Sequence, residues 1–403
     1  MDLRSRPEDE AFRLEVRGFL RQHWSDDDRR HNPPPRPTWL LAPVNRRDAA
    51  AVRLRTEAIA RGYLYRHVPQ RYGGGGAPWD PAKEAIIAEE FERAEAPAEL
   101  IGNGPNVLVP TLLECGTEEQ KQRFIRHVLL GTEYWCQGYS EPEAGSDLAA
   151  LRTRAVLEDG AWTVTGHKIW TSMADVSDWM FALVRTEPVA PRHKGLSYLL
   201  IDMTAPGISV RPLVQMNGEH EFSEVFLDNV RVPLANMVGP RGAGWAVSMS
   251  ALKHERQFAG ATLVHPRMLD GVVALARASR RRGRPAIEDP VIRDRLVALQ
   301  ARMYANSYHA YRLTTMGRRA EEPGVAGMVA KLYGSTLAYE LAKLAMDIVA
   351  DGGMLWAECA PAGGIAPNSY MQAFGVLAGG GTANIQRNVI AERGLGLPRG
   401  PTR

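Results

Sequence analysis

The segment of this sequence with the clearest chemical character is residues 135–147, which read WCQGYSEPEAGSD. Pro142 and Gly145 prevent it from forming one long helix, so we predict a short strand that leads into a tight loop rich in backbone N–H and hydroxyl groups. Further along, residues 166–172 read GHKIWTS, a predicted strand in which Trp170 stands beside hydroxyl residues. Together the two segments would form a wall for a flat polar ligand, with Trp170 stacking on it and loop amides bonding its heteroatoms.

The composition limits the classes of function. A chain of 403 residues can hold two or three domains with sizeable cores. Its net charge of +3 comes from nearly balanced acids and bases, which argues against nucleic-acid binding. The three cysteines are far apart without metal or disulfide spacing, so we expect a reducing, cytoplasmic location and no metal site. The charged N-terminus and the lack of a long apolar run predict neither a secretory signal nor membrane insertion.

Two kinds of hydrophobic periodicity divide the chain. A helical period predicts helices in the first part, and Thr117 with Gln120 forms a capping box that fixes one helix start. An alternating pattern then predicts short strands, before the helical period returns and persists to the end, with Asp289-Pro290 predicting one helix start there. The predicted helices cover 8–24, 48–61, 81–93, 104–113 and 117–129, and the predicted strands cover 162–165, 179–184, 196–201, 208–210 and 224–232. We therefore expect a helical domain over residues 1–133, a β-domain over 134–243 and a second helical domain over 244–403.

With this order of domains, the chain resembles the acyl-CoA dehydrogenase family over nearly its whole length. Each motif that carries the resemblance is weak alone, but five in the family's order are specific. They are Tyr72-Gly73-Gly74 with Glu89, Glu90 and Arg93; GTEEQK at 116–121; SEPEAGSD at 140–147; KIWTS at 168–172; and IQRNVIAER at 385–393.

The resemblance implies an α+β multidomain fold. It consists of a helical N-terminal domain, a middle β-barrel or sandwich domain and a C-terminal four-helix bundle, with FAD between the β-domain and the bundle. A flavin needs a stacking wall and hydrogen-bond donors, which this sequence offers at the matching positions. Those implied to line the flavin are Tyr139, Ser140, Gly145, Ser146, Trp170 and Ser172, with Ser146 also near the substrate. Thr382 and Asn384, after a glycine loop that opens the last helix, are implied contacts of the pyrophosphate or ribose.

The position of the catalytic base departs from the commonest family pattern. Dehydrogenation of an acyl thioester needs a carboxylate base and donors to the thioester oxygen. Many members carry the base where this chain has Gly380. A second subset places it on the first helix of the bundle, directly before an arginine, and Glu255-Arg256 matches that arrangement. The resemblance therefore implies that Glu255 is the base, that the Gly380 N–H binds the thioester oxygen and that Arg256 lies near the thioester.

The residues around Glu255 are compatible with this role. On a helix, Leu252, Glu255, Ala259 and Thr262 share one mostly small and apolar face, where burial would disfavour the charged carboxylate and make it a stronger base. Without the resemblance, a solvent-exposed glutamate is the simpler interpretation.

Two features leave cofactor contacts open. The arginines at 280–282 and 284 are either a solvated helix end or, by the resemblance, contacts of cofactor phosphates across a dimer interface. Asp347 and Asp351 stand where many relatives have glutamine and glycine, which puts the usual inter-subunit cofactor contacts in doubt.

The expected activity is FAD-dependent α,β-dehydrogenation of an acyl-CoA, or acyl-carrier, thioester to the trans-2-enoyl thioester. The resemblance implies an electron-transferring flavoprotein as electron acceptor and a homodimer or homotetramer, with a hetero-oligomer as another possibility. Two alternatives remain: a flavin-dependent monooxygenase or oxidase on the same fold, and a non-catalytic subunit of a hetero-oligomeric dehydrogenase. The sequence does not identify the acyl group.

Overall fold

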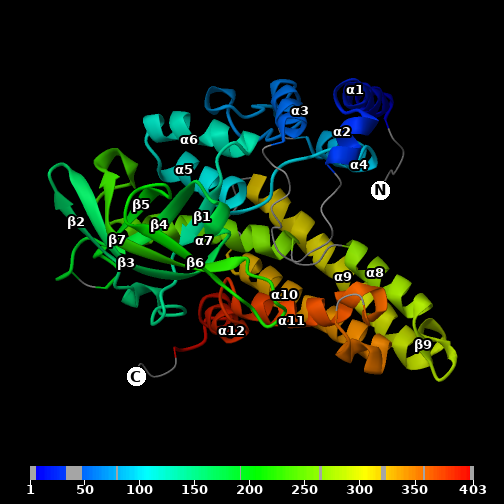
Figure 1. Cartoon of the computed structure of the whole chain (residues 1–403). Coiled ribbons are helices and arrows are strands. Elements are labelled where there is room, and N and C mark those ends of the chain that lie inside the picture. The colour runs from blue at the N-terminus through cyan, green and yellow to red at the C-terminus, as the bar shows by residue number, and fades with distance from the viewer. Residues whose placement is uncertain are drawn as a thin grey trace. The chain divides into compact units, whose positions relative to one another are not determined.

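The computed structural model describes residues 6–32, 48–78, 80–190, 192–262, 266–318, 324–356 and 359–399. The chain forms two compact units (Figure 1). Among the described residues, the first unit covers 6–213 and 220–251, and the second unit covers 214–219 and 252–399. The division into three domains at 133/134 and 243/244 stays a prediction.

The N-terminal part of the first unit is helical, as the periodicity predicts. Its N-terminal helix buries Val16, Phe19 and Leu20, which lie on one face at helical spacing. The helices are α1 (Pro7–His23), α2 (Asp26–His31), α3 (Ala49–Ala60), α4 (Pro81–Arg93), α5 (Val109–Cys115) and α6 (Glu118–Leu130). Of these, α2 was not predicted; it is a short helix that begins with its own capping box at Ser25.

The capping box at the start of α6 is confirmed. The Gln120 N–H donates to Thr117 Oγ1 at 3.2 Å, and the Thr117 N–H donates to Gln120 Oε1 at 3.1 Å. The buried Gln120 amide also donates to the carbonyl oxygens of Ala235 and Met237, at 2.7 and 2.9 Å. The residue that starts the helix therefore also fastens it to the β-domain.

The β-domain is one eight-stranded sheet with the order β6-β7-β3-β2-β4-β5-β8, in which β1 also pairs with β4. Most neighbours are antiparallel, whereas β1 and β2 run parallel to β4. The strands are β1 (Trp135–Gly138), β2 (Arg154–Glu158), β3 (Ala161–Ser172), β4 (Trp179–Arg185), β5 (Leu196–Asp202), β6 (Ile208–Leu213), β7 (Phe222–Pro233) and β8 (Met237–Val238). The predicted β-domain is thus confirmed, with β2 and β8 as additional strands.

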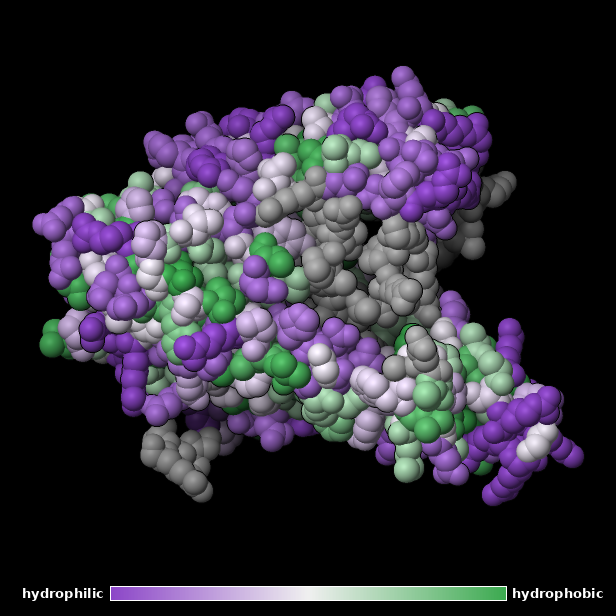
Figure 2. Space-filling view, viewed as in Figure 1, coloured by the Kyte–Doolittle hydropathy of each residue, from purple (hydrophilic) through white to green (hydrophobic). Residues whose placement is uncertain are grey.

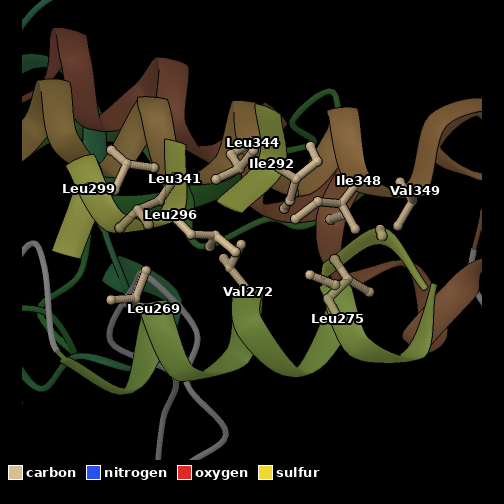
Figure 3. Close-up of a cluster of buried hydrophobic side chains, with 14 of the residues drawn as sticks. Leu269, Val272, Leu275, Ile292, Leu296, Leu299, Leu341, Leu344, Ile348 and Val349 are labelled. Carbon is tan, nitrogen blue, oxygen red and sulfur yellow. The ribbon is translucent and has the colours of Figure 1, made fainter. Parts of the chain in front are cut away.

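Helices return after the sheet. They are α7 (Gly244–Thr262), α8 (Pro266–Ala278), α9 (Pro290–Arg318), α10 (Ala326–Val349), α11 (Ile365–Ala378) and α12 (Ala383–Val389). The predicted start of α9 is confirmed by Asp289 Oδ1, which accepts from the Val291 N–H at 2.9 Å. Figure 3 shows leucine, isoleucine and valine side chains of α8, α9 and α10 meeting in the core of the second unit.

The arginine-rich segment after α8 is a two-stranded hairpin of β9 (Arg280–Arg281) and β10 (Arg284–Pro285). It lies at the end of the bundle, where the surface is strongly hydrophilic (Figure 2). The sequence placed these arginines near a helix end but did not predict the hairpin.

A buried carboxylate links α1 to α4. The Glu90 side chain is 1% exposed and accepts hydrogen bonds from Arg17 at 2.8 and 2.9 Å and from Arg13 at 3.1 Å. Arg93 lies 3.2 Å away on the same helix. The hydrogen bonds from Arg17 and Arg13 outweigh the cost of burial and lower the pKa of Glu90 to about 2.

This pKa predicts acid-dependent stability. Because the folded-state pKa lies below the ordinary value of 4.5, the stabilisation is complete above that value and disappears as the pH falls towards 2. We expect Glu90→Gln to lower the free energy of unfolding at pH 7 by about 2 kcal/mol, allowing for the partly solvated arginines. Urea unfolding should show this difference shrinking below pH 4. Glu89→Gln, which removes a neighbouring exposed carboxylate, should have a smaller effect; equal effects of the two would contradict the assignment.

Candidate active site

The loop after β1 is held in shape by its own backbone. Glu141 and Ala144 exchange two hydrogen bonds, Glu141 N–H to Ala144 O at 3.1 Å and Ala144 N–H to Glu141 O at 3.0 Å. The Ser140 carbonyl accepts from the Ile169 N–H at 2.9 Å, which joins the loop to β3. The predicted strand followed by a tight loop is therefore confirmed. Within it, Tyr139 is buried, Ser140 is half-buried, and Gly145 and Ser146 are exposed.

A buried ion pair anchors this loop. Lys168 on β3 is fully buried and donates to Glu141 Oε1 at 2.9 Å. Its ammonium also donates to the carbonyl oxygens of Tyr139, at 3.2 Å, and Leu183, at 2.8 Å. The Glu141 carboxylate in turn accepts the N–H groups of Arg152 and Thr153, at 2.6 and 2.9 Å. All three donors of the ammonium and both carboxylate oxygens are thus occupied.

The pKa shifts agree with an ionised pair. Burial by itself raises the pKa of Glu141, but the Lys168 charge and the hydrogen bonds from Thr153 and Arg152 reverse this and lower it. Burial lowers the pKa of Lys168, and the Glu141 charge opposes that shift. A carboxylate so fully bonded has no capacity left for proton transfer, so Glu141 shapes the loop.

Trp170 occupies an unusual position in β3. The pairing of β3 with β7 shifts register between Lys168 and Thr171, which is a β-bulge. Within it, Trp170 has a φ of 59°, in the left-handed region that bulky residues rarely adopt. Its side chain is 58% exposed and contacts Phe222 edge-on, with ring centroids 6.1 Å apart. Bulges and strained backbone of this kind are concentrated at binding sites, where they aim a side chain at a ligand.

Hydroxyl groups flank this tryptophan, as the sequence predicts. Ser172 is half-buried and lines a small cavity together with Met173 and Trp135. Thr171, which we did not select from the sequence, is fully buried, and its Oγ1 has no hydrogen-bond partner among the described residues. A buried hydroxyl without a partner is costly unless a ligand satisfies it. The wall of the first unit therefore has an open aromatic face and a hydroxyl that needs a partner.

In the second unit, the structure brings Glu255 and Gly380 together. Glu255 lies half-buried on α7, and a Cβ placed on Gly380 would stand 3.5 Å from Glu255 Oε1. Gly380 has a φ of 65°, and its carbonyl accepts from the Gln386 side-chain amide at 3.0 Å. The two residues expected to share the chemistry are far apart in sequence, yet they face each other. The side chain of Arg256 lies outside the described residues.

A third residue at this place was missed from the sequence. Lys331 on α10 is 2% exposed, and its Cε lies 3.7 Å from the same Cβ position on Gly380. In the sequence it is one of several lysines on helices, and only the fold shows that it is buried beside Glu255.

The segment after Gly380 begins α12. Thr382 is confirmed as its N-cap, since Oγ1 accepts from the Ile385 N–H at 3.3 Å. Gly381 has a φ of 94°, at which a side chain would be strained, and a Cβ there would lie 2.6 Å from Gln386 Nε2. Asn384 is exposed and accepts from Arg387 at 3.3 Å. Cofactor contacts of Thr382 and Asn384 stay predictions.

The arginine cluster and Asp347 meet at a surface cavity of about 570 Å³. Arg295 forms an ion pair with Asp347 at 2.6 Å, and Arg281 donates to the Asp347 carbonyl at 3.1 Å. Asp347 is thus held by this chain's own arginines. In the part of the chain that the structure describes, no group of three or more His, Cys, Asp or Glu side chains could hold a metal ion, and no helix could span a membrane.

Comparison with known proteins identifies the class. The N-terminal, middle and C-terminal domain models of acyl-CoA dehydrogenase match residues 6–132, 136–230 and 242–395. The chain belongs to the acyl-CoA dehydrogenase family, and its homologues in that family support an oxidoreductase. The resemblance in sequence and the fold that it implied are therefore confirmed.

Several individual relatives are similar to the chain. Acyl-CoA dehydrogenase IpdE1 of Mycobacterium tuberculosis is 41% identical over 336 residues, covering 82% of this chain and 84% of the relative. Acyl-CoA dehydrogenase FadE34 of the same organism is 38% identical, covering 84% of this chain and 45% of the relative. Among solved structures, the Tcur3481–Tcur3483 steroid ACAD has a TM-score of 0.75 at 28% identity, covering 99% and 100% of the two chains. The ChsE4–ChsE5 complex of M. tuberculosis has a TM-score of 0.74 at 28% identity, covering 99% and 100%.

The anchoring role of Lys168 can be tested by substitution. Lys168→Met leaves the Glu141 carboxylate and two carbonyls without their partner, so we expect the free energy of unfolding to fall by about 3 kcal/mol. Lys194→Met, at an exposed lysine of the same domain, should change it little. Glu141→Gln should lower the free energy of unfolding less in the Lys168→Met background than in the wild type. If guanidinium unfolding shows the two losses to be strictly additive, Lys168 and Glu141 do not act as an ion pair.

Proposed function

We propose that this chain catalyses FAD-dependent α,β-dehydrogenation of an acyl-CoA thioester to the trans-2-enoyl thioester, with Glu255 as the base. The observation that carries the proposal is the approach of Glu255 Oε1 to the place where a side chain on Gly380 would begin. The commonest family arrangement has its base at that position, so Glu255 supplies a carboxylate to the same place from another element.

The first unit fits a flavin. Trp170 offers an exposed ring for stacking, and the Thr171 hydroxyl is buried and lacks a partner among the described residues. Ser140, Gly145, Ser146 and Ser172 add hydroxyls and an open loop around the buried Tyr139. Nothing in the described structure lies within 4 Å of a Cβ placed on Gly145, so this part of the loop is open to a ligand. FAD, when bound, supplies the acceptor for the β hydrogen as hydride.

The chain's own residues would manage the proton and the developing charge. Glu255 takes the α proton, and the electron pair of that C–H bond forms the α,β double bond as the β hydrogen leaves with its own electron pair as hydride. The Gly380 N–H would donate to the thioester oxygen, where negative charge develops. The Gln386 amide, bonded to the Gly380 carbonyl, fixes the loop that carries this N–H. Arg256 follows the base in sequence and is the proposed contact at the thioester end.

We further propose a bulky, ring-bearing acyl group as substrate. Gly380 contributes no side chain, which leaves room beside the base. A solved structure whose similarity covers 99% of this chain is named as a steroid ACAD. The proposed electron acceptor is an electron-transferring flavoprotein. Assembly is proposed as a homodimer or homotetramer, and the similarity to the ChsE4–ChsE5 complex favours a hetero-oligomer as the second arrangement.

Glu255→Gln tests the base directly. The amide keeps the shape of the side chain but cannot accept the proton, so anaerobic bleaching of the flavin by acyl-CoA should slow at least about a hundred-fold. FAD content should stay unchanged. Asp270→Asn, at an exposed carboxylate of the same helical region, is the matched control and should bleach normally. Full activity of Glu255→Gln would overturn the proposal. Measuring the same bleaching with straight-chain, branched and steroid-like acyl-CoA thioesters identifies the substrate class.

Trp170→Ala tests the flavin wall. Loss of the stacking surface should weaken FAD binding roughly ten-fold, read from the flavin-to-protein ratio and from FAD titration of the stripped protein. Val156→Ala, at another exposed apolar residue of the sheet, is the control. If the wild-type chain purified alone takes up no FAD but does so when produced with a partner dehydrogenase subunit, the hetero-oligomer is the functional form. Undiminished FAD affinity of Trp170→Ala would contradict the stacking role.

A further inference from the structure

Lys331 is a buried cation whose position no family motif in the sequence explains. It lies on α10, and its side chain is almost completely removed from solvent. An isolated buried ammonium is strongly unfavourable, so its partners must account for its presence.

One set of partners is at the end of α11. Lys331 Nζ donates to the carbonyl oxygens of Val376 and Leu377, at 3.2 and 3.4 Å. Carbonyls in the last turn of a helix lack amide partners within the helix, and a cation is favoured there. Lys331 thereby holds the segment that leads directly to Gly380.

The other partner is Glu255. Lys331 Cε and Glu255 Oε1 both lie within 4 Å of the point where a Cβ on Gly380 would stand. Burial lowers the pKa of Lys331 to about 8, and the negative charge of Glu255 opposes this shift. At neutral pH the amine is therefore still mostly protonated, and its positive charge interacts with the negative charge of Glu255.

We propose that Lys331 is a positioning residue for the base: its ammonium holds the Glu255 carboxylate ionised and beside Gly380, while its hydrogen bonds fix the stretch of chain that carries Gly380. The proposal rests on the assignment of Glu255 as base. Lys331 would then determine both the ionisation of the Glu255 carboxylate and the position of the Gly380 N–H that binds the thioester oxygen.

Charged and titratable groups lie on several elements around Lys331. On α9 they include Arg302, which pairs with Glu340 on α10, and His309, whose Nε2 lies 3.0 Å from the Ala326 carbonyl oxygen. On α7 they are Lys253, His254 and Glu255, with Arg256 outside the described side chains. On α11 it is Tyr370, whose hydroxyl lies 3.4 Å from that of Tyr339 on α10, and on α12 it is Arg387, which is exposed and donates to Asn384. Glu255 is the group whose charge acts on Lys331 among the described residues.

Lys331→Met separates the proposed role from a purely structural one. The second-order rate constant for anaerobic flavin bleaching by acyl-CoA is measured against pH, since its profile reports the free enzyme. Loss of the Lys331 charge should move the acidic limb of the pH–rate profile to higher pH. We expect a shift of about one pH unit, which is at the lower end of the effect that an opposite charge has on a nearby carboxylate. The rate should therefore fall roughly ten-fold on that limb and recover above it. Lys343→Met, at an exposed lysine of the same helix, should leave the profile in place, and Lys331→Arg should restore it in part.

A second measurement does not depend on activity. Thermal unfolding of Lys331→Met, Glu255→Gln and the double variant should give non-additive shifts in Tm, because each single change removes the same interaction between the two charges. Because the pKa of Lys331 is lowered, the unfolded state binds more protons above pH 8, so the wild type should gain stability relative to Lys331→Met between pH 8 and 10.5.

The outcomes distinguish the two assignments. If Glu255→Gln retains activity, the base assignment fails, and the inference about Lys331 fails with it. If Glu255→Gln is inactive but folded Lys331→Met keeps the wild-type pH profile, or if the Tm shifts are additive, only the inference about Lys331 is wrong. A uniform loss of rate at every pH would show that Lys331 merely supports α11.

Discussion

The burial of the Lys168 ammonium is the constraint on which the proposed flavin wall depends. One side chain contacts the loop after β1, the following carboxylate and β4, so three segments must adopt a fixed arrangement before the charge is satisfied. The same β3 strand continues into the bulge that exposes Trp170. Leaving a buried ammonium unpaired is far less favourable in free energy than straining the backbone of one tryptophan. The ion pair can therefore keep β3 in place although the bulge departs from regular strand pairing.

The second unit also contains a buried lysine near a glutamate, but there the glutamate is more exposed. Lys331, like Lys168, is a buried lysine that donates to backbone carbonyls, and the charge of a nearby glutamate acts on it. The two glutamates differ in what surrounds them. Glu141 is buried and accepts backbone N–H groups in addition to the lysine, whereas Glu255 is only half-buried and stands at the open side of a glycine. The same pairing therefore produces a structural anchor in one place and an accessible carboxylate in the other.

Local sequence signals were sufficient for most of the fold. The capping box at Thr117, the proline after Asp289 and the alternating runs of the sheet each act over a few residues, so helix starts and strands followed directly. The β2 strand was missed because Arg154–Glu158 carries exposed residues on most of its length and lacks a clear apolar face. The resemblance to a family supplied Glu255 and Gly380. It could not supply Lys331, because nothing in the sequence around it differs from that of an exposed helical lysine such as Lys343; its burial arises from contacts between α10 and the end of α11.

The geometry at Gly380 is compatible with one carboxylate at this place, the proposed base Glu255, and not with two. Any side chain at residue 380 would start 3.5 Å from the Glu255 carboxylate and 3.7 Å from Lys331 Cε. A glutamate there would direct a second carboxylate into the same place, and two like charges so close cannot both be ionised. It would also have to adopt the positive φ of Gly380, which disfavours side chains. The carboxylate on α7 and the glycine in the loop therefore depend on each other. Because Gly380 has no side chain, there is space for the carboxylate of Glu255, the proposed base. The nearby Lys331 ammonium can compensate one negative charge at this place but not two.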